Sequence, residues 1–414
     1  MGHPFKDTIS LQEAIYRSEG PLAFNLMIKP AGSLCNLDCH YCYYLDKADI
    51  YGKESKMPVD ILEKCIKEYL EINDGEEITF DWHGGEPLLL GLEYFENIVK
   101  LQKKYKGNKK VFNTIQTNAT LLNPDFASFF KNNNFLVGVS IDGPQYIHDK
   151  YRKDKGDFPT FDKVLRGIEM LHRYGVEFNT LTTINKASEG RGLEVYSFLK
   201  RIGSRYMQFM PVVEYVNVKT DKITSPDDND AKLTSWSVDS VEYGRFMCEI
   251  FDHWVRNDVG EYFVNLFDST LANYCGMNPG TCVYSETCGA NAVVEHNGDV
   301  YPCDHYVYPE YKLGSVRTMS LSEIVGSGKM TEFGINKRNV LPSECLRCRY
   351  YFACHGECPK HRFDMTANGE KGLNTLCKGL KRFFSYTEPY MIEMRNLYFS
   401  GKSPSEIMRW KPKC

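Results

Sequence analysis

The stretch FNLMIKPAGSLCNLDCHYC, residues 24–42, joins a short apolar run to three closely spaced cysteines. Residues 24–28 have the length and composition of a buried β-strand. Cys35, Cys39 and Cys42 follow in the next loop, so three thiols lie within eight residues. Structural zinc is closed by four ligands, whereas a cubane held by three cysteines keeps one iron open. The stretch therefore favours an iron-sulfur cluster with an open iron.

Further β-rich runs follow at the spacing of successive βα units. The six expected strands are residues 24–28, 78–82, 111–116, 136–141, 178–183 and 207–212. Stretches with a helical period, such as 59–69 and 161–174, lie between them. This alternation predicts an α/β fold built on an open, partial (β/α)6 parallel barrel.

In a parallel barrel the chemistry gathers at the carboxyl ends of the strands. The segments after the expected strands are rich in glycine and polar residues. They are the cysteine loop (residues 35–42), HGGEP at 83–87, TNAT at 117–120, DGP at 142–144 and PVVEY at 211–215. We therefore expect the functional site at this rim.

The chain is long enough for more than one domain. A polar, turn-rich stretch at 217–232 reads as a linker. We expect an N-terminal extension (1–21), the barrel (22–215), a linker with a helical connection (216–274), a cysteine-rich domain (275–380) and a helical tail (381–414).

Composition excludes several classes of function. Apolar residues at 42% and charged residues at 25% are typical of globular proteins. The 50 Lys and Arg against 54 Asp and Glu offer no polycation for nucleic acid or an anionic membrane. The chain shows no signal peptide or membrane-length apolar run, so we expect a cytoplasmic protein without nucleic-acid or membrane partners. Because cytoplasmic cysteines are normally kept reduced, the 15 cysteines indicate metal or redox chemistry rather than disulfides.

The C-x3-C-x2-C spacing, with Tyr41 before the last cysteine, resembles the signature of the radical S-adenosylmethionine (SAM) superfamily. The resemblance implies a 4Fe-4S cluster that binds SAM, with Tyr41 lining the adenine pocket. HGGEP is similar to the family's GGEP segment, in which the backbone of Gly85 and the carboxylate of Glu86 would receive the methionine ammonium group. The alternative is a zinc knuckle with His40 as fourth ligand.

The same resemblance assigns three more positions by their place along the chain. Ser140 and Arg152 would bind the methionine carboxylate and the ribose, and Val213 would contact adenine through its backbone. Without the resemblance, a lone serine or arginine would read as a helix cap or a solvated charge.

The C-terminal cysteines resemble a SPASM domain, which binds two auxiliary 4Fe-4S clusters. The matching pattern is Cys288-x9-Gly298-x4-Cys303, Cys345-x2-Cys348-x5-Cys354-x3-Cys358 and then Cys377. The resemblance implies one cluster on Cys282, Cys288, Cys303 and Cys358, and another on Cys345, Cys348, Cys354 and Cys377. Cys275 competes with Cys282 for the eighth position, and two tetrahedral zinc sites are the alternative to iron.

The segment CDHYVYPEYKLG, residues 303–314, resembles anaerobic sulfatase-maturating enzymes, in which the Asp after the cysteine is the catalytic base. This implies that Asp304 takes a proton while a Ser or Cys of an unfolded or nascent sulfatase polypeptide is oxidised to formylglycine. SAM and three 4Fe-4S clusters would be the cofactors, with a flavodoxin- or ferredoxin-type electron donor. His83 is a departure, because relatives can carry Gln before GGEP.

Two other functions fit parts of the sequence. The first is a SPASM enzyme that crosslinks or otherwise modifies a ribosomal peptide with the same clusters. The second is a zinc-stabilised binding module without catalysis, which would use the cysteines as structural ligands.

Overall fold

A computed structural model describes residues 24–44, 47, 56–220, 222–224, 228–289 and 291–411. The expected N-terminal extension, residues 1–21, lies outside the described residues. The proposed division of the chain into five parts stays a prediction.

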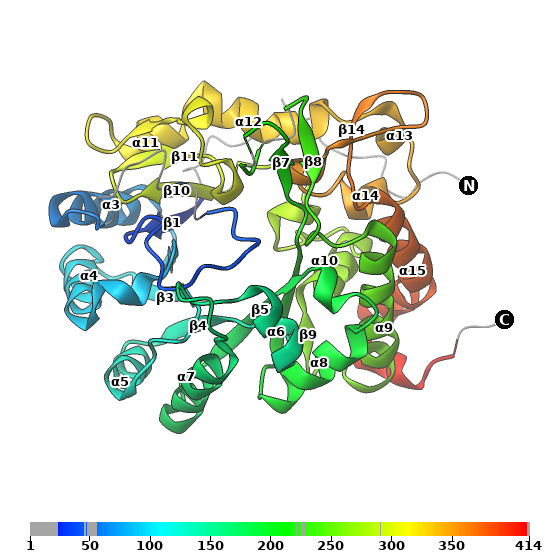
Figure 1. Ribbon diagram of the computed structural model, residues 1–414, viewed down its shortest axis with the longest axis horizontal. Helices are drawn as coiled ribbons and strands as arrows, with labels where there is room; N and C mark the ends of the chain where they lie inside the picture. Colours follow the sequence, from blue (N-terminus) through cyan, green and yellow to red (C-terminus); the bar gives the residue numbers. More distant parts are fainter. Residues whose placement is uncertain are drawn as a thin grey trace.

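The fold is organised by a mostly parallel sheet with the strand order β12-β11-β10-β1-β2-β3-β4-β5-β6-β9 (Figure 1). The barrel strands are β1 (Asn25–Lys29), β2 (Glu77–Trp82), β3 (Lys110–Thr117), β4 (Phe135–Ser140), β5 (Phe178–Ile184) and β6 (Tyr206–Pro211). Neighbours among these six pair in parallel. Each expected strand end lies within one residue of the observed end, and the predicted fold class is confirmed.

Helices cover the outside of the barrel sheet (Figure 1). They are α3 (Val59–Ile72), α4 (Leu92–Tyr105), α5 (Pro124–Asn132), α6 (Gln145–Tyr151), α7 (Phe161–Tyr174) and α8 (Gly192–Arg201). Each buries one apolar side, as Val164, Ile168 and Leu171 do on α7. These side chains and the buried strand residues form the main hydrophobic core.

The cysteine-rich segment extends the barrel sheet. Its strand β10 (Asn291–Glu295) pairs in parallel with β1, so that Glu295 lies opposite Lys29. β11 (Asp299–Tyr301) and β12 (Gly314–Ser315) continue the sheet in antiparallel fashion. The sequence did not predict this pairing, because the partners lie 266 residues apart and leave no local pattern.

The remaining elements pack beside and above the barrel (Figure 1). The helices are α9 (Ser240–Asn257), α10 (Asn265–Tyr274), α11 (Leu321–Val325), α12 (Gly328–Asn339), α13 (Ser343–Leu346), α14 (Tyr351–Cys354) and α15 (Cys377–Phe399). The strands are β7 (Tyr215–Asn217), β8 (Ala231–Leu233), β9 (Phe263–Val264), β13 (Asp364–Met365) and β14 (Lys371–Leu373). Short 3₁₀ helices are η2 (Pro87–Leu90), η3 (Lys186–Ser188), η4 (Cys282–Tyr284), η5 (Asp304–Tyr306), η6 (Pro309–Tyr311), η7 (Pro359–His361) and η8 (Pro404–Arg409).

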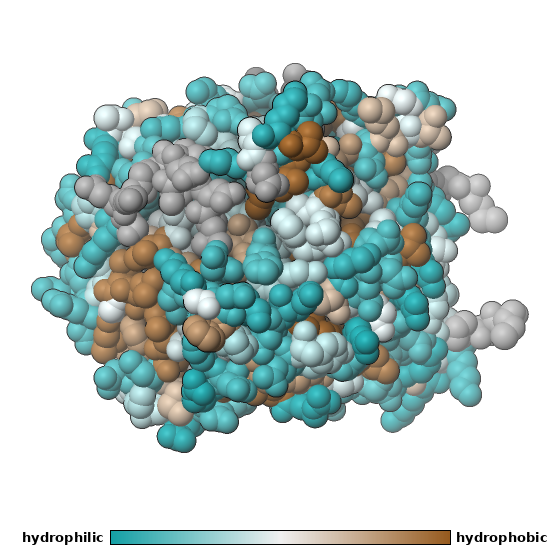
Figure 2. Space-filling view, in the orientation of Figure 1, coloured by the Kyte–Doolittle hydropathy of each residue, from teal (hydrophilic) through white to brown (hydrophobic). Residues whose placement is uncertain are grey.

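Polar side chains cover most of the visible face of the molecule, and apolar side chains gather near α4 (Figure 2). Within the described part of the chain, no helix is both long and apolar enough to span a membrane.

The helices α9 and α15 cross at two glycines, which let their backbones approach closely. A Cβ built on Gly379 would lie 1.9 Å from the carbonyl oxygen of Ser240, and one on Gly244 would lie 2.5 Å from the carbonyl oxygen of Gly379. Neither position has room for a side chain.

The Gly379→Ala variant should therefore be less stable, although alanine favours a helix by about 1 kcal/mol. The added methyl group must push the helices apart, at a cost of roughly 1–3 kcal/mol or more. We expect a lower midpoint of thermal unfolding. Gly328→Ala on α12 is the control, since its Cβ would meet nothing within 4 Å. Equal midpoints for Gly379→Ala and the wild type would contradict the tight crossing.

Candidate functional site

The cysteine loop packs against the end of α6 and the residues that follow it. The backbone N–H of Asp38 donates to the carbonyl of Lys153 (2.8 Å), and that of His40 donates to the carbonyl of Tyr151 (3.1 Å). The thiols of Cys35, Cys39 and Cys42 lie close enough to influence one another electrostatically. Burial raises the pKa of Cys35 to about 12 and that of Cys39 further. A metal that bound these groups would first have to displace their protons.

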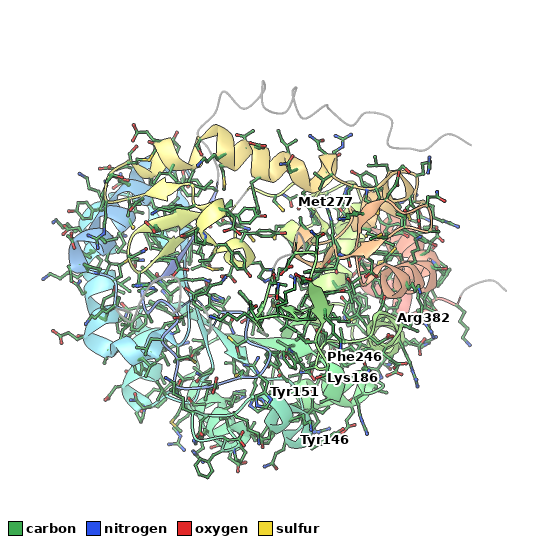
Figure 3. The ribbon with its side chains drawn as sticks, turned by 45° about the horizontal axis from the view of Figure 1, so that its top comes forward. Tyr146, Tyr151, Lys186, Phe246, Met277 and Arg382 are labelled. Carbon is green, nitrogen blue, oxygen red and sulfur yellow. The ribbon has the colours of Figure 1, made fainter. Side chains whose placement is uncertain are left out.

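Tyr151 supports the loop from one side (Figure 3). Its ring meets the rings of Tyr41 and His40 edge-on, at centroid distances of 6.2 and 6.1 Å. His40 is exposed and packs on Tyr151, an arrangement that does not by itself favour the zinc knuckle.

Glu86 braces two loops of the rim. Its carboxylate is fully buried and accepts hydrogen bonds from the backbone N–H groups of Leu88 (3.0 Å) and Asn118 (2.8 Å) and from the hydroxyl of Thr117 (2.8 Å). Burial raises its pKa to about 7, against the effect of these hydrogen bonds. These hydrogen bonds tie the HGGEP segment to the loop after β3, and the predicted contact of the Glu86 carboxylate with a ligand stays a prediction.

Gly85 is required by packing against the cysteine loop. Its N–H donates to the carbonyl of Gly32 (2.8 Å), and a Cβ at this position would lie 2.2 Å from the carbonyl oxygen of Leu34. The HGGEP segment and the cysteine loop are therefore held in backbone contact.

Arg152 and Tyr41 meet at one buried carboxylate, that of Asp142. The Arg152 Nε lies 3.0 Å from Asp142 Oδ1, and the Tyr41 hydroxyl donates to Asp142. The guanidinium also lies 5.5 Å from the centroid of the Tyr41 ring. These contacts bring the predicted residues Tyr41 and Arg152 together beside Cys39. The charge of Arg152 partly offsets the effect of burial on the pKa of the Cys39 thiol.

Ser140 is the last residue of β4, and Val213 lies in the loop that follows β6. Ser140 accepts a hydrogen bond from Gln116 Nε2 (2.9 Å). Val213 is buried, and its backbone N–H and carbonyl make no hydrogen bond among the described residues. A buried backbone N–H and carbonyl without partners can form hydrogen bonds with the edge of a planar ring that carries its own donors and acceptors.

The C-terminal cysteines form two groups. In the first group the thiols interact electrostatically with one another; its members are Cys282, which is exposed, and Cys288, Cys303 and Cys358, which are partly buried. Cys275 stands apart, since burial raises its pKa and the charge that influences it is that of Arg395 rather than of another cysteine. The geometry therefore brings Cys282, rather than Cys275, to the first group.

The second group lines a cavity with about 450 Å³ of space, partly open to solvent. Its members are Cys345, Cys348, Cys354 and Cys377. Among the other lining residues are Leu380, Phe384 and Lys381. Burial raises the pKa of Cys345 to about 11 and that of Cys354 to about 12.

The three sets of thiols fit iron-sulfur clusters in donor chemistry and in number. Among the described residues, no three His, Cys, Asp or Glu side chains converge tightly enough to hold a single metal ion. A cubane spreads its thiolates more widely than a single tetrahedral ion does, because each thiolate binds a different iron.

Asp304 follows Cys303 and faces the barrel rim. Its carboxylate forms an ion pair with Lys29, the last residue of β1, and accepts a hydrogen bond from the Tyr43 hydroxyl. Burial would raise the pKa of Asp304, but the ammonium group of Lys29, through its charge and its hydrogen bond to the carboxylate, lowers it well below its usual range. The carboxylate is therefore ionised at neutral pH and free of a proton.

Sequence reasoning missed Lys29 and Tyr43 as parts of this site. Lys29 is 1% exposed, and its ammonium lies 3.6 Å from the centroid of the Tyr44 ring. The signal was a lysine that ends the apolar run FNLMIK. His83, noted as a departure, lies in the same cluster, and burial lowers its pKa so that the ring is neutral.

Comparisons with known proteins identify the family of this chain. The radical SAM superfamily model matches residues 30–199, and the SPASM model, described as an iron-sulfur cluster-binding domain, matches residues 282–349. The chain is 44% identical over 389 residues to a serine-type anaerobic sulfatase-maturating enzyme of Bacteroides thetaiotaomicron, covering 93% of this chain and 94% of that protein. It is 35% identical over 384 residues to a cysteine-type enzyme of Clostridium perfringens, covering 90% and 98%.

A solved structure titled "Native anSMEcpe with bound AdoMet" matches with a TM-score of 0.79 and 33% identity, covering 90% of this chain and 99% of that chain. A second structure of that protein, with AdoMet and a Cp18Cys peptide, matches with a TM-score of 0.79 and 32% identity, over the same shares of each chain. With this identity over nearly its whole length, the chain belongs to the anaerobic sulfatase-maturating enzymes of the radical SAM superfamily.

Proposed function

We propose that this chain oxidises a serine or cysteine side chain of an unfolded or nascent sulfatase polypeptide to Cα-formylglycine. The supporting observation is Asp304, an ionised carboxylate that directly follows a cysteine of the first group and contacts Lys29 at the barrel rim. The 44% identity to a serine-type relative supports the same reaction class. The proposal includes a flavodoxin- or ferredoxin-type electron donor and a cytoplasmic location.

The proposal assigns a cofactor to each set of cysteines. Cys35, Cys39 and Cys42 would hold the cluster that binds SAM, and the first and second groups would hold the auxiliary clusters. Tyr41, Ser140, Arg152 and Val213 would surround SAM, and the backbone of Gly85 together with the carboxylate of Glu86 would receive its ammonium group. When bound, SAM and the clusters supply a 5′-deoxyadenosyl radical that removes one hydrogen atom and an acceptor for one electron.

The chain's own residues would control the proton. Conversion of CH2–OH to CH=O removes one hydrogen atom, one proton and one electron. Asp304 would take the proton at its carboxylate, which Lys29 and Tyr43 hold in place. With cysteine the same balance gives a thioaldehyde, which water converts to the aldehyde with release of hydrogen sulfide.

Asp304→Asn should separate cofactor cleavage from substrate oxidation. An amide takes no proton under these conditions, so aldehyde formation should fall about 100-fold or more. Formation of 5′-deoxyadenosine should continue. Mass spectrometry of a sulfatase peptide and chromatography of the nucleoside measure the two products. Asp299→Asn on β11 is the control, and wild-type aldehyde formation by Asp304→Asn would remove Asp304 from the reaction.

Cys35→Ala should lose both products, because the cysteine loop would hold no complete cluster. The iron content of anaerobically reconstituted protein should fall from about twelve to about eight per chain, one cubane fewer. Retention of about twelve irons and of SAM cleavage would show that the cysteine loop does not hold the reactive cluster.

The eighth auxiliary ligand can be tested with two matched variants. Cys282→Ala should lower the iron content or change the electron paramagnetic resonance (EPR) spectrum of one auxiliary cluster, since the thiol of Cys282 interacts with those of Cys288 and Cys303. Cys275→Ala should keep the wild-type iron content and spectrum. The reverse pattern would assign the position to Cys275.

A further inference from the structure

Two cations are buried among the C-terminal cysteines. Lys337 on α12 and Arg362 after η7 are 1% and 5% exposed. Neither forms an ion pair with a carboxylate among the described residues. Burying an ion costs several kcal/mol unless it is compensated, so a negative charge from another source is expected beside them.

The ammonium group of Lys337 donates hydrogen bonds to the loop that carries Cys282. Its Nζ donates to the carbonyl oxygens of Cys282 (2.6 Å), Val283 (2.8 Å) and Ser285 (2.6 Å). An ammonium group has three N–H donors, so this set uses all of them. Lys337 therefore fastens η4 to α12.

Arg362 is bonded to carbonyl oxygens in the same way. Its Nη1 donates to the carbonyl of Lys337 (2.6 Å), and its Nε donates to that of Gly356 (3.1 Å). Its charge influences the thiols of Cys288, in the first group, and Cys345, in the second group. The charge of Arg362 therefore influences thiols of both groups, so it does not account for a difference in potential between their clusters.

Lys337, by contrast, is hydrogen-bonded to the loop of the first group and influences three thiols of that group electrostatically. They are Cys288, Cys358 and Cys282. A cluster with four thiolate ligands carries a net negative charge, which grows by one unit when the cluster is reduced. A buried cation beside it stabilises the reduced form more than the oxidised form and raises the reduction potential.

We propose that Lys337 is a positioning residue of the first auxiliary cluster, which fixes the Cys282 loop and raises the reduction potential of that cluster relative to the second. The proposal rests on the cluster assignment made under the proposed function. Because Asp304 directly follows Cys303, the cluster favoured by Lys337 is also the one whose ligand is adjacent in the chain to the proposed proton acceptor.

The test is an EPR-monitored redox titration of the reconstituted full-length protein, with iron analysis. Lys337→Met should keep about twelve irons, and the potential of one auxiliary cluster should fall so that its ratio of reduced to oxidised form drops at least tenfold, about 59 mV for one electron. Lys337→Arg should stay near the wild type. Lys329→Met, an exposed lysine on the same helix, is the matched control and should change nothing.

An unchanged potential in iron-replete Lys337→Met overturns the proposal. If Lys337→Met loses iron, Lys337→Gln, which keeps amide donors for the carbonyls, takes its place under the same criterion. If both neutral variants lose about four irons, full iron in Lys337→Arg supports the proposal, and loss there overturns it, because the defect would then follow from shape rather than charge. Failure of the proposed function is distinguishable, since it appears in the wild type as missing iron or missing aldehyde.

Discussion

The parallel pairing of β1 with β10 is the constraint on which the site depends. It carries Glu295 opposite Lys29 at the barrel rim, and a short hairpin later the chain reaches Cys303 and Asp304. The Lys29–Asp304 ion pair then joins the end of a barrel strand to the cysteine-rich segment. Because both side chains are largely removed from water, losing either partner would leave a buried charge. The pairing therefore fixes the position of the carboxylate and keeps it ionised.

Burial of the thiols links the folding of this chain to its cofactors. Desolvation raises the pKa of Cys35, Cys303 and Cys354, so the free groups are protonated at neutral pH. Metal ligation requires thiolates, and the free energy of binding must overcome this cost. The same low-dielectric surroundings strengthen the field of Lys337 and Arg362 at their neighbours. Cysteines and cations that would be unfavourable alone become compatible when a negatively charged cluster lies between them.

The sequence predicted what local patterns can encode. Six apolar runs with regular spacing placed the barrel strands to within one residue, and the resemblance to SPASM domains sorted the C-terminal cysteines into two groups. Lys29 and Tyr43 were missed, because their roles arise from contacts with Asp304, more than 260 residues away. For Glu86 the position was found but its surroundings were not: only the fold reveals that Thr117 and Asn118 already bind the carboxylate. Long-range pairing and burial cannot be predicted from the sequence of a single segment.

The proposed oxidation uses groups from two parts of the chain, the barrel and the cysteine-rich segment. Tyr41, Arg152 and the cysteine loop belong to the barrel, where the hydrogen atom would leave the substrate, whereas Asp304 and the first cysteine group belong to the cysteine-rich segment. After loss of a hydrogen atom the substrate carries an unpaired electron, and removal of the neighbouring proton makes it strongly reducing. The carboxylate of Asp304 directly follows Cys303, a ligand of the cluster that is the proposed electron acceptor. The proton and the electron would therefore both pass to the cysteine-rich segment. A fold that separated Asp304 from the first group would allow the hydrogen atom to be removed but would leave the oxidation incomplete.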